Sequence, residues 1–380
     1  MKKIIYLDHA ATTPVDERVL NKMIPYFNIC YGNPSSIYSI GRKNKLAIEK
    51  AREEIAEIIN AKTKEIYFTS CGSESDNLAL KGIAYANTGK HIITSKIEHP
   101  AILNTCKALE KQGYKITYLN VDEKGFVDLE QLDNSINNET VLISIMFANN
   151  EIGTIEPIEK IGKIAREKKV FFHTDAVQAM GNVKIDVQEL GVDLLSMSAH
   201  KFYGPKGVGT LYVRSGIKFE TIQNGGHQEK GKRAGTENVA GIIGMAEALK
   251  YAYKEFDKNN EKLLKLRKYF INLLKEEIRN ININGDLEKR LPGNINVSFE
   301  NCDGQQLLLD LDEYGICASS GSACSAGNTT PSHVLTAIGL DAKAVNGTLR
   351  FSLGKENNEE EIKSVVNAIK VCFLKENNMV

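Results

Sequence analysis

The sequence predicts an α/β fold, in which a large domain with a mostly parallel, doubly wound sheet of seven strands adjoins a smaller α+β domain. Seven short β-rich runs lie between residues 66 and 213, and helical patterns separate most of them. Strands that are apolar on both faces and alternate with helices are typical of a parallel sheet covered on both sides. The pattern then changes to a mixture of strands and helices. We assign residues 15–255 to the large domain, and residues 1–14 and 256–380 to the small one.

The first sixty residues contain two loops and one long helix. A short strand leads into the small and polar residues Asp8 to Pro14, which suit a loop near a ligand, and a second loop follows at 31–36. An amphipathic helix is expected from about Arg42 to Asn60, because apolar residues recur there at helical spacing. These apolar residues are Leu46, Ile48, Ala51, Ile55, Ile58 and Ile59.

The central stretch supplies the predicted sheet. Its strands are expected at 66–69, 91–94, 115–119, 141–146, 170–174, 193–197 and 208–213. Helical patterns lie between several of these strands, at 74–87, 100–112 and 157–168. The last two strands have no helix between them, which allows one of them to run antiparallel to the rest.

The last third begins with a glycine-rich, polar segment at 225–240, which we expect to be a functional loop. A long helix follows over about 240–279, and a break near Asn259-Asn260 would divide it. The small domain is then expected to have strands near 294–299 and 348–353, and helices near 304–313, 331–338 and 359–374.

The composition excludes several classes of protein. With 42% hydrophobic and 25% charged residues, the chain resembles an ordinary globular protein. Its 48 basic and 48 acidic residues give a net charge of zero, so nothing favours direct binding of nucleic acid or of an anionic membrane. No apolar run approaches the length of a membrane span, and the N-terminus turns acidic at Asp8, too early for a signal peptide. We therefore expect a cytoplasmic protein.

Seven cysteines are distributed along the chain, and no two of them form a C-x-x-C pair. They are Cys30, Cys71, Cys106, Cys302, Cys317, Cys324 and Cys372. An odd number without paired spacing argues against a disulfide framework and against a zinc site, so no metal is predicted. Most of these cysteines are expected to be small buried apolar residues, and one of them is a candidate reactive thiol.

The clearest candidate for chemistry is the stretch from Leu195 to Gly207, which follows a buried strand. It presents Ser198, His200 and Lys201 in a row and then turns at a Gly-Pro pair. A lysine at a strand end among small residues can be partly desolvated, which frees its amine to form a Schiff base. For an arbitrary lysine, a solvated position in a loop is the simpler alternative.

A second candidate is the loop that follows the strand at 66–69. Gly72 and Ser73 would lie at the N-terminus of a helix, where free N–H groups and the helix dipole favour a phosphate. A simple helix cap made by Ser73, with Asp76 three residues on, explains the same residues. The two interpretations are compatible.

Three further strand ends carry polar side chains, and in a doubly wound sheet such residues gather at one edge. His99 could stack on a flat ring or move a proton, and Asn149-Asn150 offer amide donors. Asp175 is a carboxylate at a buried strand end and needs a cation, which a protonated pyridine nitrogen would supply, while Gln178 could donate to a ring oxygen. With Lys201, these residues together predict a site for pyridoxal 5'-phosphate.

The C-terminal part adds a second chemistry. Cys324 lies in a run of small residues, Ser319 to Asn328, which is typical of a mobile loop that could bring a thiolate to a substrate. Arg350 lies within an apolar strand, where a guanidinium usually has an anionic partner. A substrate carboxylate would serve, and an internal salt bridge is the competing explanation.

These motifs together resemble a cysteine desulfurase of the class-V aminotransferase family, within the fold-type I superfamily of pyridoxal-phosphate enzymes. The specific pieces are "SAHKFYGPKG", "NNEIGT", "HTDAVQ", "GTEN" and "SSGSACSAG", and the resemblance extends from Tyr6 to the Arg350 strand. The cysteine loop is the most specific of them, because a generic aminotransferase has none. The full-length loop resembles that of the long-loop branch, which supplies sulfur for iron–sulfur clusters.

The resemblance implies a role for each cofactor-binding residue. Lys201 would form the Schiff base, Asp175 would pair with the pyridine nitrogen, and Gln178 would contact the ring oxygen. His99 would stack on the ring and assist proton transfer. The phosphate would be held by Gly72, Ser73, Ser198 and His200, and by a Thr236 that reaches across from the neighbouring subunit of a homodimer.

The resemblance also implies the reaction and its partners. L-cysteine, bound through Asn33, Asn150 and Arg350, would be converted to L-alanine, and its sulfur would pass to Cys324 as a persulfide. A sulfur-acceptor protein, such as an iron–sulfur scaffold or a component of transfer-RNA thiolation, would receive it. Selenocysteine lyase activity, transamination and a non-catalytic sulfur relay are the alternatives.

The chain departs from the family pattern at two positions. Cys71 and Ser73 stand where the family usually has Gly and Thr. Serine keeps the hydroxyl, so phosphate binding should be retained, whereas Cys71 could narrow the turn.

Overall fold

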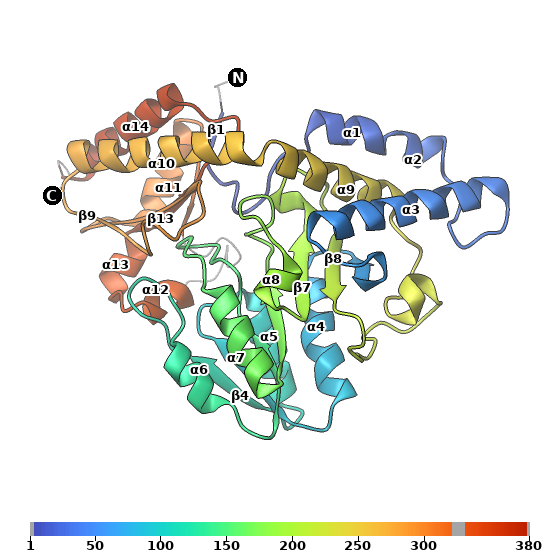
Figure 1. Ribbon diagram of the computed structural model, residues 1–380. Coiled ribbons are helices and arrows are strands. Elements are labelled where there is room, and N and C mark those ends of the chain that lie inside the picture. Colours follow the sequence, from blue (N-terminus) through green and yellow to red (C-terminus); the bar gives the residue numbers. More distant parts are fainter. Residues whose placement is uncertain (1–3, 321–330, 378–380) are drawn as a thin grey trace.

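The structure, a computed structural model, describes residues 4–320 and 331–377. Figure 1 shows a larger lobe built around one sheet and a smaller lobe of helices and short strands beside it. The described ends of the chain both lie at the smaller lobe (Figure 1).

A single sheet forms the centre of the larger lobe. Its strands are β2 (Ile66–Thr69), β3 (His91–Ser95), β4 (Lys115–Leu119), β5 (Thr140–Ser144), β6 (Phe171–Asp175), β7 (Leu194–Ser198) and β8 (Gly209–Val213). Their order in space is β2-β8-β7-β6-β5-β3-β4. β8 runs antiparallel to both of its neighbours, and the other neighbouring pairs are parallel. The predicted seven-stranded, mostly parallel sheet is therefore confirmed.

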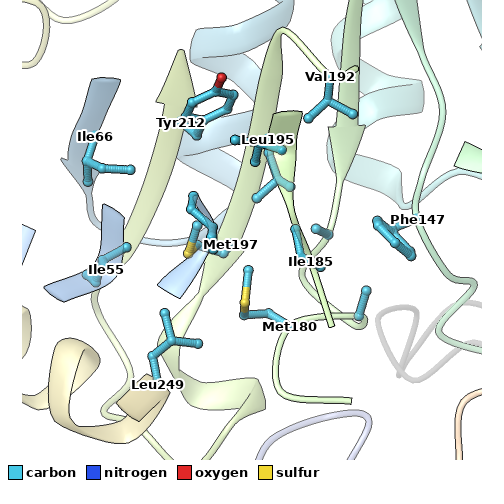
Figure 2. Close-up of a cluster of buried hydrophobic side chains, with 14 of the residues drawn as sticks. Ile55, Ile66, Phe147, Met180, Ile185, Val192, Leu195, Met197, Tyr212 and Leu249 are labelled. Carbon is cyan, nitrogen blue, oxygen red and sulfur yellow. The ribbon is translucent and has the colours of Figure 1, made fainter. Parts of the chain in front are cut away.

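Helices cover both faces of this sheet. On one side pack α3 (Ser39–Ile58), α7 (Ile158–Lys168) and α9 (Val239–Lys254), and on the other α4 (Gly72–Ala86) and α5 (Pro100–Glu110). Successive strand residues alternate between the two cores, so that Leu195 faces the first and Leu194 the second. Figure 2 shows the first core, where Leu195 and Tyr212 of the sheet lie among side chains such as Ile55. Burial of both strand faces explains why the strands read as apolar runs.

The smaller lobe combines two short sheets with three longer helices. One sheet has the order β12-β13-β10-β9, from Ser319–Ser320, Thr348–Ser352, Asn294–Phe299 and Ile281–Ile283. The other pairs β1 (Ile5–Tyr6) in parallel with β11 (Ile316–Cys317). The helices are α10 (Phe256–Glu277), α11 (Gly304–Glu313) and α14 (Glu359–Asn377). Leu7, Phe270 and Phe351 share one buried core, which joins the N-terminal segment to the C-terminal third of the chain.

Two details of the predicted helices are wrong. The long helical stretch divides at Glu255, between α9 and α10, and not at Asn259-Asn260. Asn260 instead lies within α10, and its side chain donates a hydrogen bond to Asn182 O. The asparagine pair that suggested a helix break therefore makes a tertiary contact. Leu46, placed on the apolar face of α3, is 70% exposed.

The remaining helices are short. They are α1 (Glu17–Met23), α2 (Pro25–Asn28), α6 (Leu129–Ser135), α8 (Val187–Leu190), α12 (His333–Ala337) and α13 (Ala342–Asn346), with 3-10 turns η1 (Thr63–Glu65), η2 (Ala199–Lys201) and η3 (Gln228–Gly231). η3 lies in the predicted loop at 225–240, and its buried Glu229 pairs with Arg52 of α3 at 2.7 Å. Within the described ranges, no helix is both long enough and apolar enough to cross a membrane.

Candidate active site

A cavity of about 390 Å³ lies where β6 and β7 end and α4 begins. Ten of the predicted site residues line it, namely Gly72, Ser73, His99, Asn150, Asp175, Gln178, Ser198, His200, Lys201 and Arg350. Side chains from positions 72 to 350 of the chain therefore meet in one place. The parallel strands explain this, because their carboxyl ends share one edge of the sheet.

Lys201 reaches the cavity from the turn η2, directly after β7. Its Nζ donates hydrogen bonds to the backbone oxygens of Ala10 and Ala11, at 2.6 and 2.7 Å. Thr13 fixes the same N-terminal segment to the turn, because its Oγ1 donates to His200 O at 2.9 Å and accepts from Tyr203 N at 2.8 Å. The amine is thus held by backbone oxygens at the edge of the cavity, in a position where a lysine can be reactive.

Asp175 ends β6 and is almost completely buried. Its Oδ1 accepts a hydrogen bond from Val177 N at 2.9 Å. Burial raises the pKa of Asp175 to about 6, while the Val177 N–H and the charge of Lys201 act to lower it. Gln178 follows on the same loop, and its Nε2 donates to Ala10 O at 2.9 Å.

His99 is the N-cap residue of α5 and lines the same cavity. Its Nδ1 accepts a hydrogen bond from Ala101 N at 3.1 Å, so the neutral ring carries its proton on Nε2. Burial, and to a smaller extent the charge of Lys201, lower the pKa of His99 to about 4. The ring is therefore neutral at physiological pH and can donate from Nε2.

The N-terminus of α4 forms one end of the cavity. The helix begins at Gly72 after the N-cap residue Cys71, so the alternative in which Ser73 acts as the helix cap is wrong. A Cβ on Gly72 would lie 2.7 Å from Val177 Cγ2, so only glycine fits beside that side chain. Ser73 is exposed in this turn, and its hydroxyl is available to a ligand in the cavity.

Ser198 and His200 lie where β7 passes into the turn η2. Ser198 is the last residue of β7 and is buried at the cavity wall. His200 Nδ1 lies 3.1 Å from Thr12 Oγ1. Burial lowers the pKa of His200 to about 4, and the charge of Lys201 adds to this, so its ring is also neutral at physiological pH. Neutral donors here suit a phosphate group.

Arg350 projects from β13 of the smaller lobe and is only 1% exposed. Its Nη2 donates to Asp8 Oδ1 at 2.8 Å and its Nη1 to Asn150 O at 3.1 Å. Its Nε has no hydrogen-bond partner among the described residues. The internal salt bridge that was the competing explanation is therefore present, with Asp8 as the partner. The same residue also lines the cavity, so the salt bridge does not rule out a ligand.

Two of the predicted site residues that the structure describes do not line this cavity. Thr236 lines a separate cavity of about 200 Å³ near Arg233. Asn33 is exposed, and its Oδ1 accepts a hydrogen bond from Ser35 N at 2.9 Å. Cys324 lies outside the described residues.

The structure also adds residues that the sequence did not single out for this site. Asp8 pairs with Arg350, and Ala10 accepts hydrogen bonds from both Lys201 and Gln178. Asp76 lines the cavity and is buried, although its spacing from Ser73 had suggested only a helix cap. Its position one turn into a helix that begins at the sheet edge could have indicated that it faces the site.

A metal centre finds no support in the part of the chain that the structure describes. Among these residues, no group of three or more His, Cys, Asp or Glu side chains could hold a metal ion. Cys106, Cys302 and Cys372 are buried, as expected of small apolar residues, whereas Cys71 is partly exposed at the cavity.

The chain has many relatives of known name. Residues 5–365 match the family described as Aminotransferase class-V. The chain is 53% identical over 373 residues to "Cysteine desulfurase IscS" of Clostridium botulinum, which corresponds to 97% of this chain and 94% of that relative. A solved structure titled "NIFS-LIKE PROTEIN" superposes with a TM-score of 0.92 at 40% identity, over 98% of this chain and 99% of that one. A second, "SspA in complex with cysteine", gives a TM-score of 0.84 at 39% identity, over 94% and 100%. The chain therefore belongs to the aminotransferase class-V family, in the group whose members carry the name cysteine desulfurase.

Proposed function

We propose that this protein is a cysteine desulfurase that converts L-cysteine to L-alanine and keeps the sulfur as a persulfide on Cys324. The observation that carries the proposal is the shared cavity. One cavity holds a lysine amine, a buried carboxylate and a buried arginine, at Lys201, Asp175 and Arg350. The names of the relatives, and a related structure titled as a complex with cysteine, support the choice of substrate.

The cavity fits pyridoxal 5'-phosphate. Asp175 is a buried carboxylate whose raised pKa indicates an unmet need for a cation, and a pyridine N–H would meet it. The N-terminus of α4 at Gly72 offers backbone N–H groups, and Ser73, Ser198 and His200 would complete a phosphate site. Lys201, Gln178 and His99 would hold the rest of the ring. When bound, this cofactor supplies an aldehyde for a Schiff base and a ring that takes up electrons from the substrate α-carbon.

The residues of the chain then have defined tasks. Lys201 Nζ would remove the proton from the substrate α-carbon, because it lies at the cavity edge and its backbone contacts orient it. His99 would donate from Nε2, since its Nδ1 is occupied by Ala101 N. Asp175 would remain ionised against the ring cation.

The substrate carboxylate would bind between Arg350 and Asn150. Arg350 lines the cavity, and its Nε has no hydrogen-bond partner within residues 4–320 and 331–377, which leaves it one donor not yet in use. This contact would orient the substrate in the cavity. The Cys324 thiolate would attack the substrate sulfur, so that an S–S bond forms as the substrate C–S bond breaks. The electron pair of the C–S bond would go to the carbon, which takes up protons and becomes the methyl group of L-alanine. The carbon is reduced as the sulfur is oxidised, so no external oxidant is needed.

A homodimer is part of the proposal. Large apolar side chains are exposed between residues 20 and 46, on α1, α2, the following loop and the start of α3, which we call the N-terminal apolar face. They are Leu20, Ile24, Phe27, Ile29, Tyr31, Ile37, Tyr38, Ile40 and Leu46. A monomer rarely leaves so many together, and a second copy is the expected cover. Thr236 and Asn33, which do not line the cavity of their own chain, would then serve the partner's site.

The remaining expectations concern the setting of the reaction. We propose a cytoplasmic enzyme that passes the persulfide sulfur to an acceptor protein, for iron–sulfur cluster assembly or transfer-RNA thiolation, without contacting nucleic acid or membrane directly. We also propose that residues 15–255 form one domain and that residues 1–14 and 256–380 form the other. The buried core that contains Leu7 and Phe351 supports this, since it joins the two ends of the chain.

The decisive experiment follows colour and product in the same preparation. The purified protein should be yellow and should form alanine from cysteine in the presence of a thiol. Lys201→Ala should lose the colour shift that a lysine-bound cofactor gives, and Cys324→Ala should stay yellow but form no persulfide. Full turnover by Cys324→Ala would refute the role of that cysteine. Faster reaction with selenocysteine or with keto acids than with cysteine would refute the substrate.

A further inference from the structure

Asp76 is a buried acid in the cavity wall that the proposed mechanism does not use. It lies in the second turn of α4, is 1% exposed and lines the same cavity as Asp175. Among the described residues, its Oδ1 accepts no hydrogen bond. An ionised carboxylate in such a place would be costly, because neither water nor a donor compensates the charge on that oxygen.

The groups around Asp76 are mainly acids. They come from separate elements: Asp175 ends β6, Glu98 follows β3 and Cys71 precedes α4. A basic residue, His173, also lies close by, with its Nε2 3.8 Å from Asp76 Oδ1. Its charge does not help, because burial lowers the pKa of His173 to about 3 and keeps the ring neutral.

The contacts of His173 support this assignment. Its Nδ1 lies 2.9 Å from Ser144 Oγ and its Nε2 lies 2.9 Å from Ser196 Oγ. Both ring nitrogens are therefore occupied by hydroxyls, which can donate or accept as a neutral ring requires.

Asp76 and Asp175 are unequal members of one buried pair. Asp175 accepts the Val177 N–H at 2.9 Å and is favoured as an anion by the charge of Lys201. For Asp76, burial and then the charge of Asp175 raise the pKa well above its usual range, and only the Ser196 hydroxyl opposes them to any extent. Two carboxyl groups that share a buried site do not ionise together easily, and the proton stays on the less well solvated one.

We propose that Asp76 is a positioning residue that stays protonated and uncharged behind Asp175, so that Asp175 alone presents a negative charge to the cofactor ring. This inference rests on the proposed function in one respect, namely that a pyridine nitrogen meets Asp175. The Asp175 carboxylate alone then faces the protonated pyridine nitrogen. If Asp76 were also ionised, the ring would face two negative charges, and its own charge would be altered. The proton of Asp76 is kept throughout and is not transferred to the substrate.

The proton can be observed without the cofactor. Infrared spectra of cofactor-free protein with ¹³C-carboxyl aspartate should show the C=O band of a protonated aspartate at neutral pH. The label separates this band from the buried glutamates, such as Glu98. Asp76→Asn should remove the band. Asp193→Asn is the matched control and should keep it, because Asp193 is also buried but is paired with Arg214 and accepts the Phe172 N–H.

A third variant tests the coupling between the two acids. In Asp175→Asn the like charge is gone, so the band of Asp76 should disappear on raising the pH about one pH unit earlier than in the unchanged protein. This arm remains informative if Asp76→Asn does not fold. Absence of the band at neutral pH in the unchanged protein, or its survival in Asp76→Asn, would overturn the assignment.

The loaded enzyme provides a second readout. The visible absorbance of the bound cofactor should change at the alkaline pH where the infrared band disappears, and Asp76→Asn should lack this change while Asp193→Asn retains it. An identical absorbance titration in Asp76→Asn and in the unchanged protein would contradict the link to the cofactor. A colourless protein would refute the proposed function instead, and the infrared result for Asp76 would still stand or fall by itself.

Discussion

Arg350 is a buried arginine with one unused donor. Its two terminal nitrogens are held by Asp8 and by the backbone of Asn150, while Nε has no partner among the described residues. The ion pair with Asp8 fixes the plane of the guanidinium, and Arg350 lines the cavity. The proposed binding role of Arg350 would therefore be added to a structural one.

Replacing Arg350 should weaken the binding of substrate more than the chemistry. In Arg350→Lys the charge remains but the planar fork is lost, and Asp8 then repels the substrate carboxylate. We expect KM for cysteine to rise about 10- to 100-fold, as for the loss of a charge-assisted hydrogen bond of ~1.5–3 kcal/mol, with a smaller fall in kcat. Steady-state kinetics on the yellow enzyme would measure both.

A substrate without a carboxylate serves as the control for this prediction. Cysteamine lacks the group that Arg350 is proposed to bind, so Arg350→Lys should change its turnover far less than that of cysteine. An equal loss with both compounds would mean that the variant damages the site in general.

Single residues show what sequence can and cannot predict about this site. Lys201 and Asp175 could be predicted because each follows an apolar strand directly, and parallel strands bring such residues together. Asp76 could not, since its importance depends on the direction in which α4 enters the sheet. Thr236 and Asn33, named from the family resemblance, lie away from the cavity of their own chain.

At the scale of elements, the N-terminus of α4 is fitted closely against the loop after β6. A Cβ at Gly72 would lie 2.7 Å from Val177 Cγ2 and 3.4 Å from Ser198 Cβ. The absence of a side chain lets the first turn of the helix approach the ends of β6 and β7, where the proposed phosphate site lies.

Gly72→Ala should therefore weaken cofactor binding. The added methyl group must displace Val177 or the first turn of α4, and either movement shifts the N–H groups at the phosphate site. We expect the Kd for pyridoxal 5'-phosphate to rise at least about tenfold, a cost of ~1–3 kcal/mol for overpacking. Absorbance titration of the cofactor-free protein would measure it.

The paired variant Gly72→Ala with Val177→Ala tests the cause. It removes the methyl group that the new Cβ would meet, so it should recover much of the lost affinity. Failure to recover, with Val177→Ala alone binding normally, would contradict the steric explanation.

The elements that the sequence predicted well are those whose residues determine them locally. The seven central strands could be located because burial on both faces gives continuous apolar runs. The short strand before Asp8 was predicted, but the strands β9, β11 and β12 were missed. Two or three residues have no pattern, and their pairing depends on distant partners, such as Ile316 of β11 with Ile5 of β1. The division between α9 and α10 was misplaced by a few residues, since an asparagine pair is only a weak breaker.

At the scale of the whole molecule, several acids in the described part of the chain are buried so deeply that burial outweighs the groups that would keep them ionised. Burial raises the pKa of Glu98 to about 8 and that of Glu151 to about 7, and it raises the pKa of Glu156 and Asp76 well above their usual range. Glu98, Glu151 and Glu156 lie in the loops after β3 and β5, on the side of the sheet where the cavity lies. At this edge of the sheet, the folded protein therefore keeps carboxyl protons at pH values where the same groups in the unfolded chain would be ionised.

This arrangement predicts that the cofactor-free protein is most stable in mild acid. A carboxyl group whose pKa is raised by folding favours the folded state while protonated, and that advantage is lost as the pH rises from its ordinary value toward the raised one. For Glu98 the window runs from 4.5 to about 8. At the acid end, Arg18 lowers the pKa of Asp16, and this contribution is lost as the pH falls below the ordinary value of 3.8. The unfolding free energy should thus decline between about pH 5 and pH 8.

Glu98→Gln should flatten this decline. Its Oε1 accepts hydrogen bonds from Ser95 Oγ at 2.6 Å and Met146 N at 3.0 Å, and an amide oxygen can accept both. The variant cannot ionise, so denaturant unfolding at about pH 5 and pH 8 should differ less than in the unchanged protein, by on the order of a few kcal/mol. Glu276→Gln, at an exposed position on α10, should leave the difference unchanged. If Glu98→Gln showed the same decline as Glu276→Gln, the buried proton on Glu98 would not be a source of the pH dependence.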